Sequence, residues 1–308
     1  MNIMTLINAL PGAVAQGLIW GIMAIGVYLT FRILDFADLT VDGSMCTGGA
    51  VCIMMMQAGF GVWPSMLAAT GAGMLTGLAT GIFHTCMGIP AILSGILTQL
   101  SLYSVNLKIM GKANQAISVG KYDLLVSLRY IKGVPFYQNT IFVVAVFILV
   151  LIAVLYWFFG TELGCAIRAT GCNSSMSRAQ GINTSFNKVL GLMVSNGLVA
   201  LSSALLAQYQ GFADVNMGRG AIVIGLAAVI IGEAVFSKIF RNFALRLLGV
   251  ALGSILYYLV LQTVIWLGID TDLLKLLSAI VVAIFLATPY WKGKYFSKPM
   301  KRGGNSNA

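Results

Sequence analysis

The chain has 308 residues, of which 59% are hydrophobic and only 9% are charged, whereas an ordinary soluble domain carries about a quarter charged residues. Its 19 Lys and Arg and nine Asp and Glu are too few to cover a soluble globule of this length. The net charge of +10 comes from cations scattered between apolar runs, which argues against a nucleic-acid-binding face, so the composition predicts a polytopic membrane protein.

Nine apolar runs have a length suited to crossing the membrane, since a spanning helix needs roughly 20 residues for about 30 Å of hydrocarbon. They cover residues 10–31, 39–58, 63–83, 89–110, 138–160, 187–209, 220–237, 246–268 and 273–291. The second run contains Asp42 and three glycines and the fourth begins at Pro90, so one of them could be broken or re-entrant. We therefore predict an all-α membrane bundle of eight or nine spans, forming one domain over residues 1–291.

The densest polar cluster lies between the first two runs, in TFRILDFADLTVDGS. If this stretch is helical, Arg32 and Asp35 lie one turn apart and can pair. Two interpretations stay open: a solvated connection, or a break in a helix that lines a path through the membrane. The candidate path residues, to which we add one amide from the sixth run, are Asp38, Thr40, Asp42, Ser44 and Asn196.

Small residues recur every four positions in the third run, at Ala69, Gly73, Gly77 and Gly81. This spacing removes bulk from one helical face and lets two backbones approach closely. We expect the close contact to be made within the chain.

Lys and Arg in the short connections indicate the orientation of the chain. The loop 161–188, the loop 238–246 and the tail 292–308 are basic and are predicted to be cytoplasmic, which makes the C-terminus cytoplasmic. The intervening connections 210–219 and 268–272 are then outside. For the loop 161–188 two interpretations stay open: a docking loop for a partner or an ordinary basic loop.

Residues suited to catalysis are scarce. The single histidine, His84, lies at an apolar helix, and no HExxH, GxSxG or paired-carboxylate spacing occurs, so neither an enzyme nor a metal site is expected. Without a Walker A sequence, any ATP used in transport must bind to another subunit. Glu233 is the one acid embedded in a late apolar run, and Lys238 is a candidate partner for it.

Two stretches resemble signatures of a known family, the permease subunits of ATP-binding-cassette importers for branched-chain amino acids and ribose-type sugars. Residues 18–44, LIWGIMAIGVYLTFRILDFADLTVDGS, are similar to the first signature, and residues 163–207 are similar to the coupling loop and the span after it. The residues that match the loop, with one neighbouring cation as an adjunct, are Arg168, Ala169, Gly171, Asn173, Arg178, Gly181 and Ile182. Where many members carry Glu-Ala-Ala, this chain has Ser-Met-Ser at 175–177, so a salt bridge from that glutamate is not implied.

The resemblance implies a type II-like importer permease fold in the cell membrane. It also implies a second permease copy, two ATPase subunits that bind ATP, and an extracytoplasmic solute-binding protein. The segment 32–37, RILDFA, is similar to the amino-acid branch, so the expected solute is an amino acid, and the aromatic branch for tryptophan or tyrosine is one choice.

Three other interpretations stay open. The chain could be a sugar or nucleoside permease of the same family, or a membrane scaffold without transport activity. It could also be an ion-coupled secondary transporter, in which membrane carboxylates such as Asp38 or Glu233 titrate.

Overall fold

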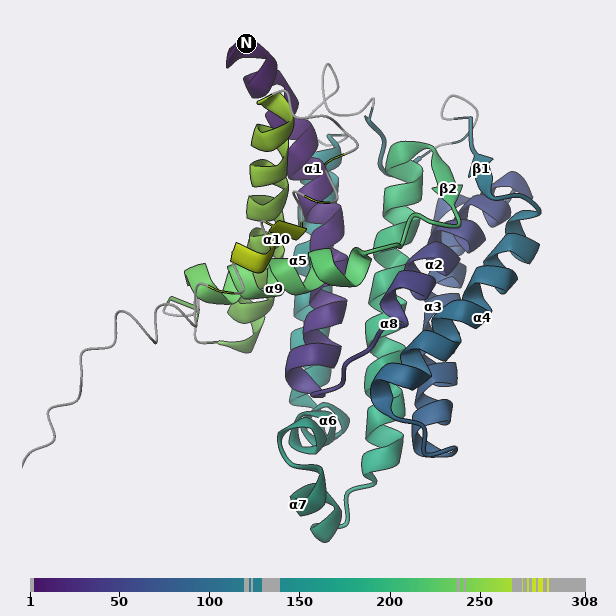
Figure 1. Cartoon of the computed structure of the whole chain (residues 1–308), viewed down its shortest axis with the longest axis vertical. Helices are drawn as coiled ribbons and strands as arrows, with labels where there is room; N and C mark the ends of the chain where they lie inside the picture. Colours follow the sequence, from purple (N-terminus) through teal and green to yellow (C-terminus); the bar gives the residue numbers. More distant parts are fainter. Residues whose placement is uncertain are drawn as a thin grey trace, which may run out of the picture.

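The computed structural model describes residues 3–118, 122, 124–128, 139–236, 239–240 and 242–267, followed by residues 273, 276, 279–280, 282–284 and 287. The last predicted run, 273–291, lies mostly outside the described residues, and the basic tail 292–308 lies wholly outside them. In the part that is described, the chain is a helical bundle with one short two-stranded ribbon (Figure 1).

Eight of the nine predicted apolar runs each correspond to one helix, and the predicted loop 161–188 contains two short helices. The elements in chain order are α1 (Ile3–Tyr28), η1 (Leu29–Ile33), α2 (Val41–Gln57), α3 (Val62–Thr85), α4 (Ala91–Met110), β1 (Asn114–Ala116), α5 (Thr140–Gly160), α6 (Glu162–Cys172), α7 (Ser174–Ala179), α8 (Thr184–Gln210), β2 (Phe212–Asp214), α9 (Ala221–Phe236) and α10 (Phe243–Trp266). The prediction of a predominantly helical chain is confirmed.

Within the described residues, five helices are long and apolar enough to cross a membrane. They are Ile7–Ile33, Val62–Thr85, Thr140–Gly160, Thr184–Gln210 and Phe243–Trp266, and Ala221–Phe236 is a shorter apolar helix. This supports a multi-pass membrane protein, while the count of eight or nine spans stays a prediction.

The long helices α1 and α8 run along the long axis of the molecule (Figure 1). The short helices α6 and α7 lie at one end of this axis, and the β1–β2 ribbon and the start of α1 lie toward the other. Two helices do not follow this pattern: α2 begins part-way along the axis, and α9 runs across it. The run 39–58, predicted as a possible break, is therefore a helix that begins inside the bundle.

The small residues of α3 pack against α8, so the predicted close contact is made within the chain. A Cβ atom added at Gly73 would collide with the carbonyl oxygen of Asn196, and one added at Gly77 would collide with that of Leu192. Only glycine permits this distance between the two backbones, and the contact is made within one chain.

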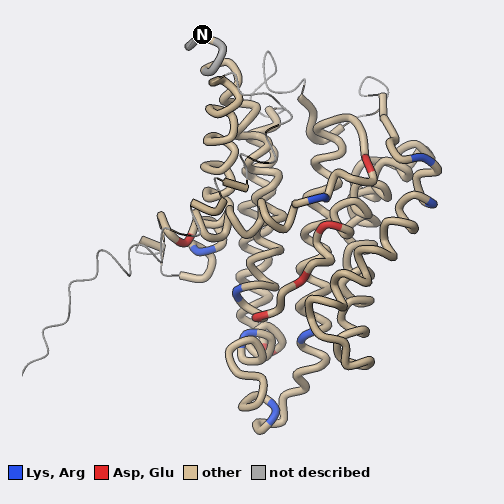
Figure 2. The backbone as a smooth tube through the Cα atoms, viewed as in Figure 1, with Lys and Arg blue, Asp and Glu red and all other residues tan. Residues whose placement is uncertain are grey.

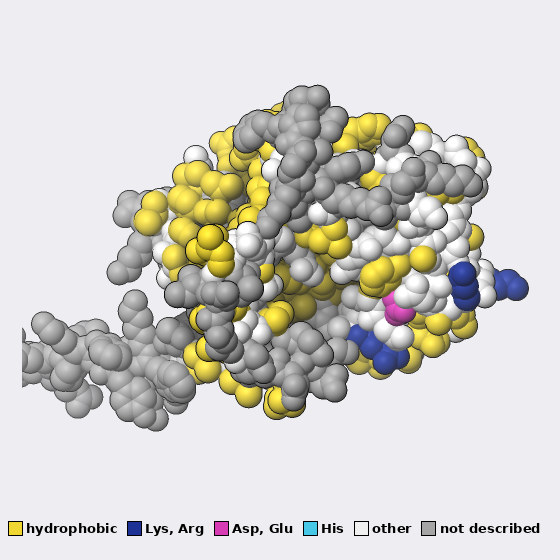
Figure 3. All heavy atoms as spheres, turned by 90° about the horizontal axis from the view of Figure 1, so that it is seen from above, with side chains coloured by type: hydrophobic (Ala, Val, Ile, Leu, Met, Phe, Trp, Pro, Cys, Tyr) yellow, Lys and Arg dark blue, Asp and Glu magenta, His cyan; other side chains and the backbone are white. Residues whose placement is uncertain are grey.

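Charged residues are sparse along the described helices (Figure 2). Several Lys and Arg lie near the α6–α7 end, and others lie near the end of α4. Viewed from the end where α1 begins, the described charges gather at one edge of the face, and hydrophobic side chains form patches over other described parts of it (Figure 3). The small number of charged residues along the helices suits a protein whose flanks contact lipid.

The helical pairing expected between Arg32 and Asp35 is wrong. The π-helical turn η1 ends at Ile33, and Asp35 has a φ of 52°, a left-handed conformation that Asp tolerates better than most residues. Because the helix ends there, Arg32 is free to reach another element, and its Nε donates to Glu233 Oε1 at 3.0 Å. The other candidate partner of Glu233, Lys238, lies outside the described residues.

Candidate functional site

The residues before α2 form an extended segment whose side chains alternate between buried and exposed positions. Asp38 is only 2% exposed, although it carries a carboxyl group. Its Oδ1 accepts from the backbone N–H of Thr40 at 2.9 Å, and its Oδ2 accepts from Nδ2 of Asn196 on α8 at 2.7 Å. Both bonds offset the cost of burying this carboxyl group inside a membrane protein.

Asn196 is fully buried and connects Asp38 to the first turn of α2. Its Oδ1 accepts from the hydroxyl of Ser44 at 2.6 Å, while its Nδ2 also donates to the carbonyl of Leu192 at 3.0 Å. The Ser44 hydroxyl lies 2.6 Å from that of Thr76 on α3. A single amide therefore binds the interrupted start of α2 to α8.

A second branch of hydroxyl groups connects the same region to α3 and α4. The Thr40 hydroxyl lies 2.6 Å from the Thr80 hydroxyl, which donates to Thr98 on α4 at 2.9 Å. We name the joined set the polar network, and its members are Asp38, Thr40, Ser44, Thr76, Thr80, Thr98 and Asn196. Because every member is hydrogen-bonded and at most 5% exposed, the polar network fixes α2 against three helices.

Asp42 was expected beside these residues, but it faces the other side of the α2 start. Its Oδ2 accepts from the backbone N–H of Gly220 at 3.0 Å, and its Oδ1 accepts from that of Ile222 at 3.0 Å. These amides belong to the first turn of α9, where the helix dipole favours a negative charge. Asp42 thus caps α9 from a different helix.

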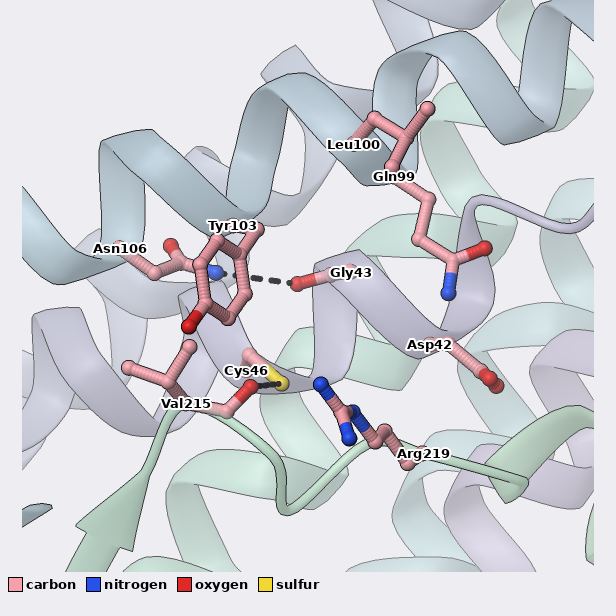
Figure 4. Close-up of a pocket in the computed structure, with 9 residues that line it drawn as sticks. All are labelled: Asp42, Gly43, Cys46, Gln99, Leu100, Tyr103, Asn106, Val215 and Arg219. Atoms are coloured by element: carbon pink, nitrogen blue, oxygen red, sulfur yellow. Dashed lines mark hydrogen bonds between the residues drawn. The ribbon is translucent and has the colours of Figure 1, made fainter. Parts of the chain in front are cut away.

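The Asp42 side of α2 borders a pocket of about 270 Å³ (Figure 4). It lies between the first turns of α2, the face of α4 and the segment that connects β2 to α9. The lining residues are Asp42, Gly43, Cys46, Gln99, Leu100, Tyr103, Asn106, Val215 and Arg219. Asp38 lines a different and smaller pocket of about 160 Å³, so the two acids border separate spaces.

The predicted coupling loop folds as two short helices with side-chain caps. Thr161 caps α6 by accepting from the N–H of Gly164 at 3.4 Å, and Asn173 caps α7 by accepting from that of Met176 at 3.0 Å. Asn183 caps α8 in the same way, accepting from Phe186 N–H at 3.1 Å. The loop is thus a defined helical structure.

The end of α7 is made by a glycine. Gly181 has a φ of +82°, and the following N–H, that of Ile182, donates to the carbonyl of Ser177 at 3.0 Å. A Cβ atom at Gly181 would meet nothing within 4 Å. Backbone conformation, and not lack of space, therefore requires glycine here.

Several apolar side chains of this end are exposed. Three of them are about half exposed and available to a partner: Leu163 (48%), Met176 (59%) and Phe186 (54%). Two cations accompany them: Arg178 is exposed, and the guanidinium carbon of Arg168 lies 5.5 Å from the ring centroid of Phe243. Apolar anchors beside cations are typical of a protein contact surface.

The loop also contacts the interior of the chain. A Cβ atom at Gly171 would collide with the carbonyl oxygen of Ile33, so α6 lies directly on the end of η1. The next residue, Leu34, is 3% exposed and packs near Gly191 of α8, which also lies near Ile167 of α6. The loop therefore contacts the segment that leads to Asp38.

The structure brings four of the five predicted path residues into the polar network and places Asp42 at the pocket. Their role in a path stays a prediction, as does the contact of the loop residues with an ATPase. The residues that sequence reasoning missed are Thr76, Thr80, Thr98, Gln99, Tyr103, Asn106 and Arg219. One signal was present, because Thr76 and Thr80 are four residues apart beside the small-residue face of α3.

Comparisons with known proteins give a consistent result. The family model described as branched-chain amino acid transport system, permease component, matches residues 10–286. The tyrosine transport system permease protein of Clostridioides difficile is 38% identical over 281 residues, which is 91% of either chain. An uncharacterized protein of Rickettsia prowazekii is 35% identical over 91% of this chain and 98% of its own.

The fructose import permease protein of Bifidobacterium longum is a more distant relative, 27% identical over 86% of this chain and 73% of its own. No solved structure is significantly similar to the chain.

Proposed function

The chain belongs to the family of permease components of branched-chain amino acid transport systems, and on that premise we propose that it imports an amino acid with energy from ATP hydrolysis. The similarity to a tyrosine permease over 91% of both chains supports an aromatic amino acid as the solute. ATP would bind to a separate ATPase subunit.

The proposed assembly contains two copies of this chain, two ATPase subunits and a solute-binding protein outside the cell. The proposed fold is a type II-like permease with eight or nine spans, to which α2 and α9 contribute helices that begin inside the membrane. Basic residues near α6 and α7 support a cytoplasmic position for this end, and the C-terminus would lie on the same side.

One observation carries the proposal: α6 and α7 combine an exposed contact surface with a direct contact to the interior. Leu163 and Met176 would seat the loop on the ATPase, while Gly171 contacts the carbonyl of Ile33. ATP-driven closure of the ATPases would move α6, and the segment from Ile33 to Asp38 would move with it. This displacement would favour either an inward-open or an outward-open arrangement.

The proposal is tested by reconstitution. The chain is purified from its native membrane with any associated ATPase, placed in proteoliposomes and supplied with the binding protein and L-tyrosine. ATP-dependent uptake that disappears without ATP supports the proposal. Uptake that continues without ATP but stops when the proton gradient is collapsed would contradict it and favour a secondary transporter.

The coupling loop has its own test at Gly181. Gly181→Val is expected to leave the permease folded but to reduce uptake at least fivefold relative to ATP hydrolysis, since a β-branched residue disfavours a φ of +82°. Gly181→Asn is the matched control, because Asn tolerates this conformation, and it should keep most of the coupling. Normal coupling in Gly181→Val would count against the role of the loop.

A further inference from the structure

The geometry points to the pocket between α2, α4 and the β2–α9 connection as a binding site in the permease itself for a free α-amino acid with an aromatic side chain. We name it the α4 pocket. The inference rests on the proposed function and deepens it, because it assigns recognition of the solute to residues that no comparison assigns.

The first element of the site is a cation without an ion-pair partner among the described residues. Arg219 is exposed and lines the α4 pocket, and its guanidinium has no ion-pair partner within the described residues. Figure 4 shows this guanidinium extending from the β2–α9 connection toward the side where Cys46 lies. A guanidinium offers parallel N–H donors that match the two oxygens of a carboxylate, so Arg219 is suited to the solute carboxylate.

The second element is two separate acceptors, of which the Asp42 carboxylate is suited to an ammonium group. Asn106 is 1% exposed, and its Nδ2 donates to the carbonyl of Gly43 at 3.4 Å, but its buried Oδ1 has no hydrogen-bond partner among the described residues. A buried acceptor without a partner is costly and uncommon in a native structure. Asp42 lies at the other end of the labelled set from Asn106 (Figure 4); it supplies the negative charge and, after accepting two backbone amides, still has lone pairs available for an ammonium group.

The third element is an apolar and aromatic wall. Leu100 and Tyr103 lie on α4, and Figure 4 shows the Tyr103 ring on the opposite side of the labelled set from Arg219. The ring offers a surface for an apolar or aromatic side chain, in the offset or edge arrangement that aromatic pairs prefer. The volume, about 270 Å³, is near the lower end of ordinary small-molecule sites, which suits a metabolite of amino-acid size.

The position of the pocket agrees with this use. It is bordered by the first turn of α2 and by the connection that enters α9, and α2 begins inside the bundle (Figure 1). Interrupted helices in transporters commonly place their ends around a solute near the middle of the membrane. An amino acid carries a carboxylate and an ammonium group. The same pocket offers a charged partner to each, Arg219 to the carboxylate and Asp42 to the ammonium group.

The test is saturation-transfer NMR on the purified permease–ATPase complex in nanodiscs, without binding protein or ATP. L-tyrosine should give ring-proton saturation, whereas tyramine, which lacks the carboxylate, should give at least fivefold less. Arg219→Gln should reduce the L-tyrosine signal at least fivefold. Because Arg219 is exposed and makes no ion pair in the described residues, this variant should fold normally.

Two controls make the result decisive. Lys112→Gln removes an exposed cation that does not line the α4 pocket and should keep the wild-type signal, while empty nanodiscs should give none. An unchanged L-tyrosine signal in Arg219→Gln, an equal signal from D-ribose, or no signal from the wild type would overturn the inference. Failure of the proposed function is distinguishable, because it appears as the absence of ATP-dependent uptake in proteoliposomes, a separate measurement.

Discussion

The start of α2 separates two polar regions that the sequence presents as one cluster. On one side, Asp38 and Ser44 belong to the polar network, in which every member is hydrogen-bonded inside the chain. On the other side, Asp42 borders the α4 pocket, where Arg219 has no ion-pair partner among the described residues and Asn106 Oδ1 has no hydrogen bond. The two regions therefore differ in hydrogen bonding: the polar network is satisfied inside the chain, whereas the α4 pocket holds an amide oxygen and a guanidinium without such partners among the described residues.

The largest effect is expected from breaking the polar network at Asn196. Asn196→Leu removes the donor to the buried Asp38 carboxylate and the acceptor for Ser44, and it should lower the free energy of unfolding by about 3 kcal/mol. Thermal unfolding followed by fluorescence-detected size exclusion measures the loss. Adding Asp38→Asn to this variant removes the unpaired carboxylate and should recover part of it. An unchanged unfolding midpoint in Asn196→Leu would show that the network is not structural.

A smaller loss is expected at Asp42, which caps α9. Asp42→Asn removes the negative charge and one of two carboxylate acceptors at the first turn of α9, so unfolding should become easier by about 1 kcal/mol. The matched control is Asp35→Asn, since Asp35 is exposed and Asn also tolerates its φ of 52°. Equal losses in the two variants would refute the capping role.

A substitution at Thr80 tests one branch of the polar network and is expected to lower the free energy of unfolding less than the substitutions at Asn196 and Asp42. Thr80→Val keeps the shape but removes the hydroxyl that contacts Thr40 and Thr98, and it should cost about 1 kcal/mol or less because Thr98 also bonds within its own helix. Thr85→Val is the comparison, since the Thr85 hydroxyl donates to Gly81 of the same helix. If both variants unfold at the same midpoint, the Thr40–Thr80–Thr98 branch adds nothing to stability.

The smallest effect on stability is expected at Arg219. Arg219→Gln should change the free energy of unfolding by less than about 0.5 kcal/mol, because the side chain is exposed and makes no ion pair in the described part of the chain. The same thermal measurement applies. A loss above about 1 kcal/mol would place Arg219 with the structural groups and remove the contrast between the two regions.

Much of the fold could be predicted from the sequence because membrane helices are recognised by length and apolarity alone. The positions of α3, α5 and α8 follow from their runs, and the two helices of the loop 161–188 follow from its caps and glycines. The part-way start of α2 could not be located, because it depends on packing against helices distant in the sequence. The sequence pattern left a solvated connection and an interrupted helix equally open.

The candidate site was predicted in part. Asn196 stands out because amides are rare in apolar runs, and Asp38 and Ser44 stand out because they belong to the densest polar cluster of the sequence. Thr80 did not, since threonine hydroxyls are common in membrane helices and usually bond their own backbone. Arg219 lies in the connection 210–219, where the sequence gives no sign of a site, and its position at a pocket follows from the folding of β2 and α9 against α2.

The helix α5 has the highest mean hydropathy of the candidate spans, 3.1, and only 28% of its most apolar stretch is buried inside the molecule. Trp157 and Val150 are 72% and 58% exposed, so lipid is the main neighbour of its outer face. On such a face, one apolar side chain can replace another without disturbing the packing of the bundle. Among related permeases, the sequence of α5 should therefore vary more than the sequence of the buried segment around Asp38.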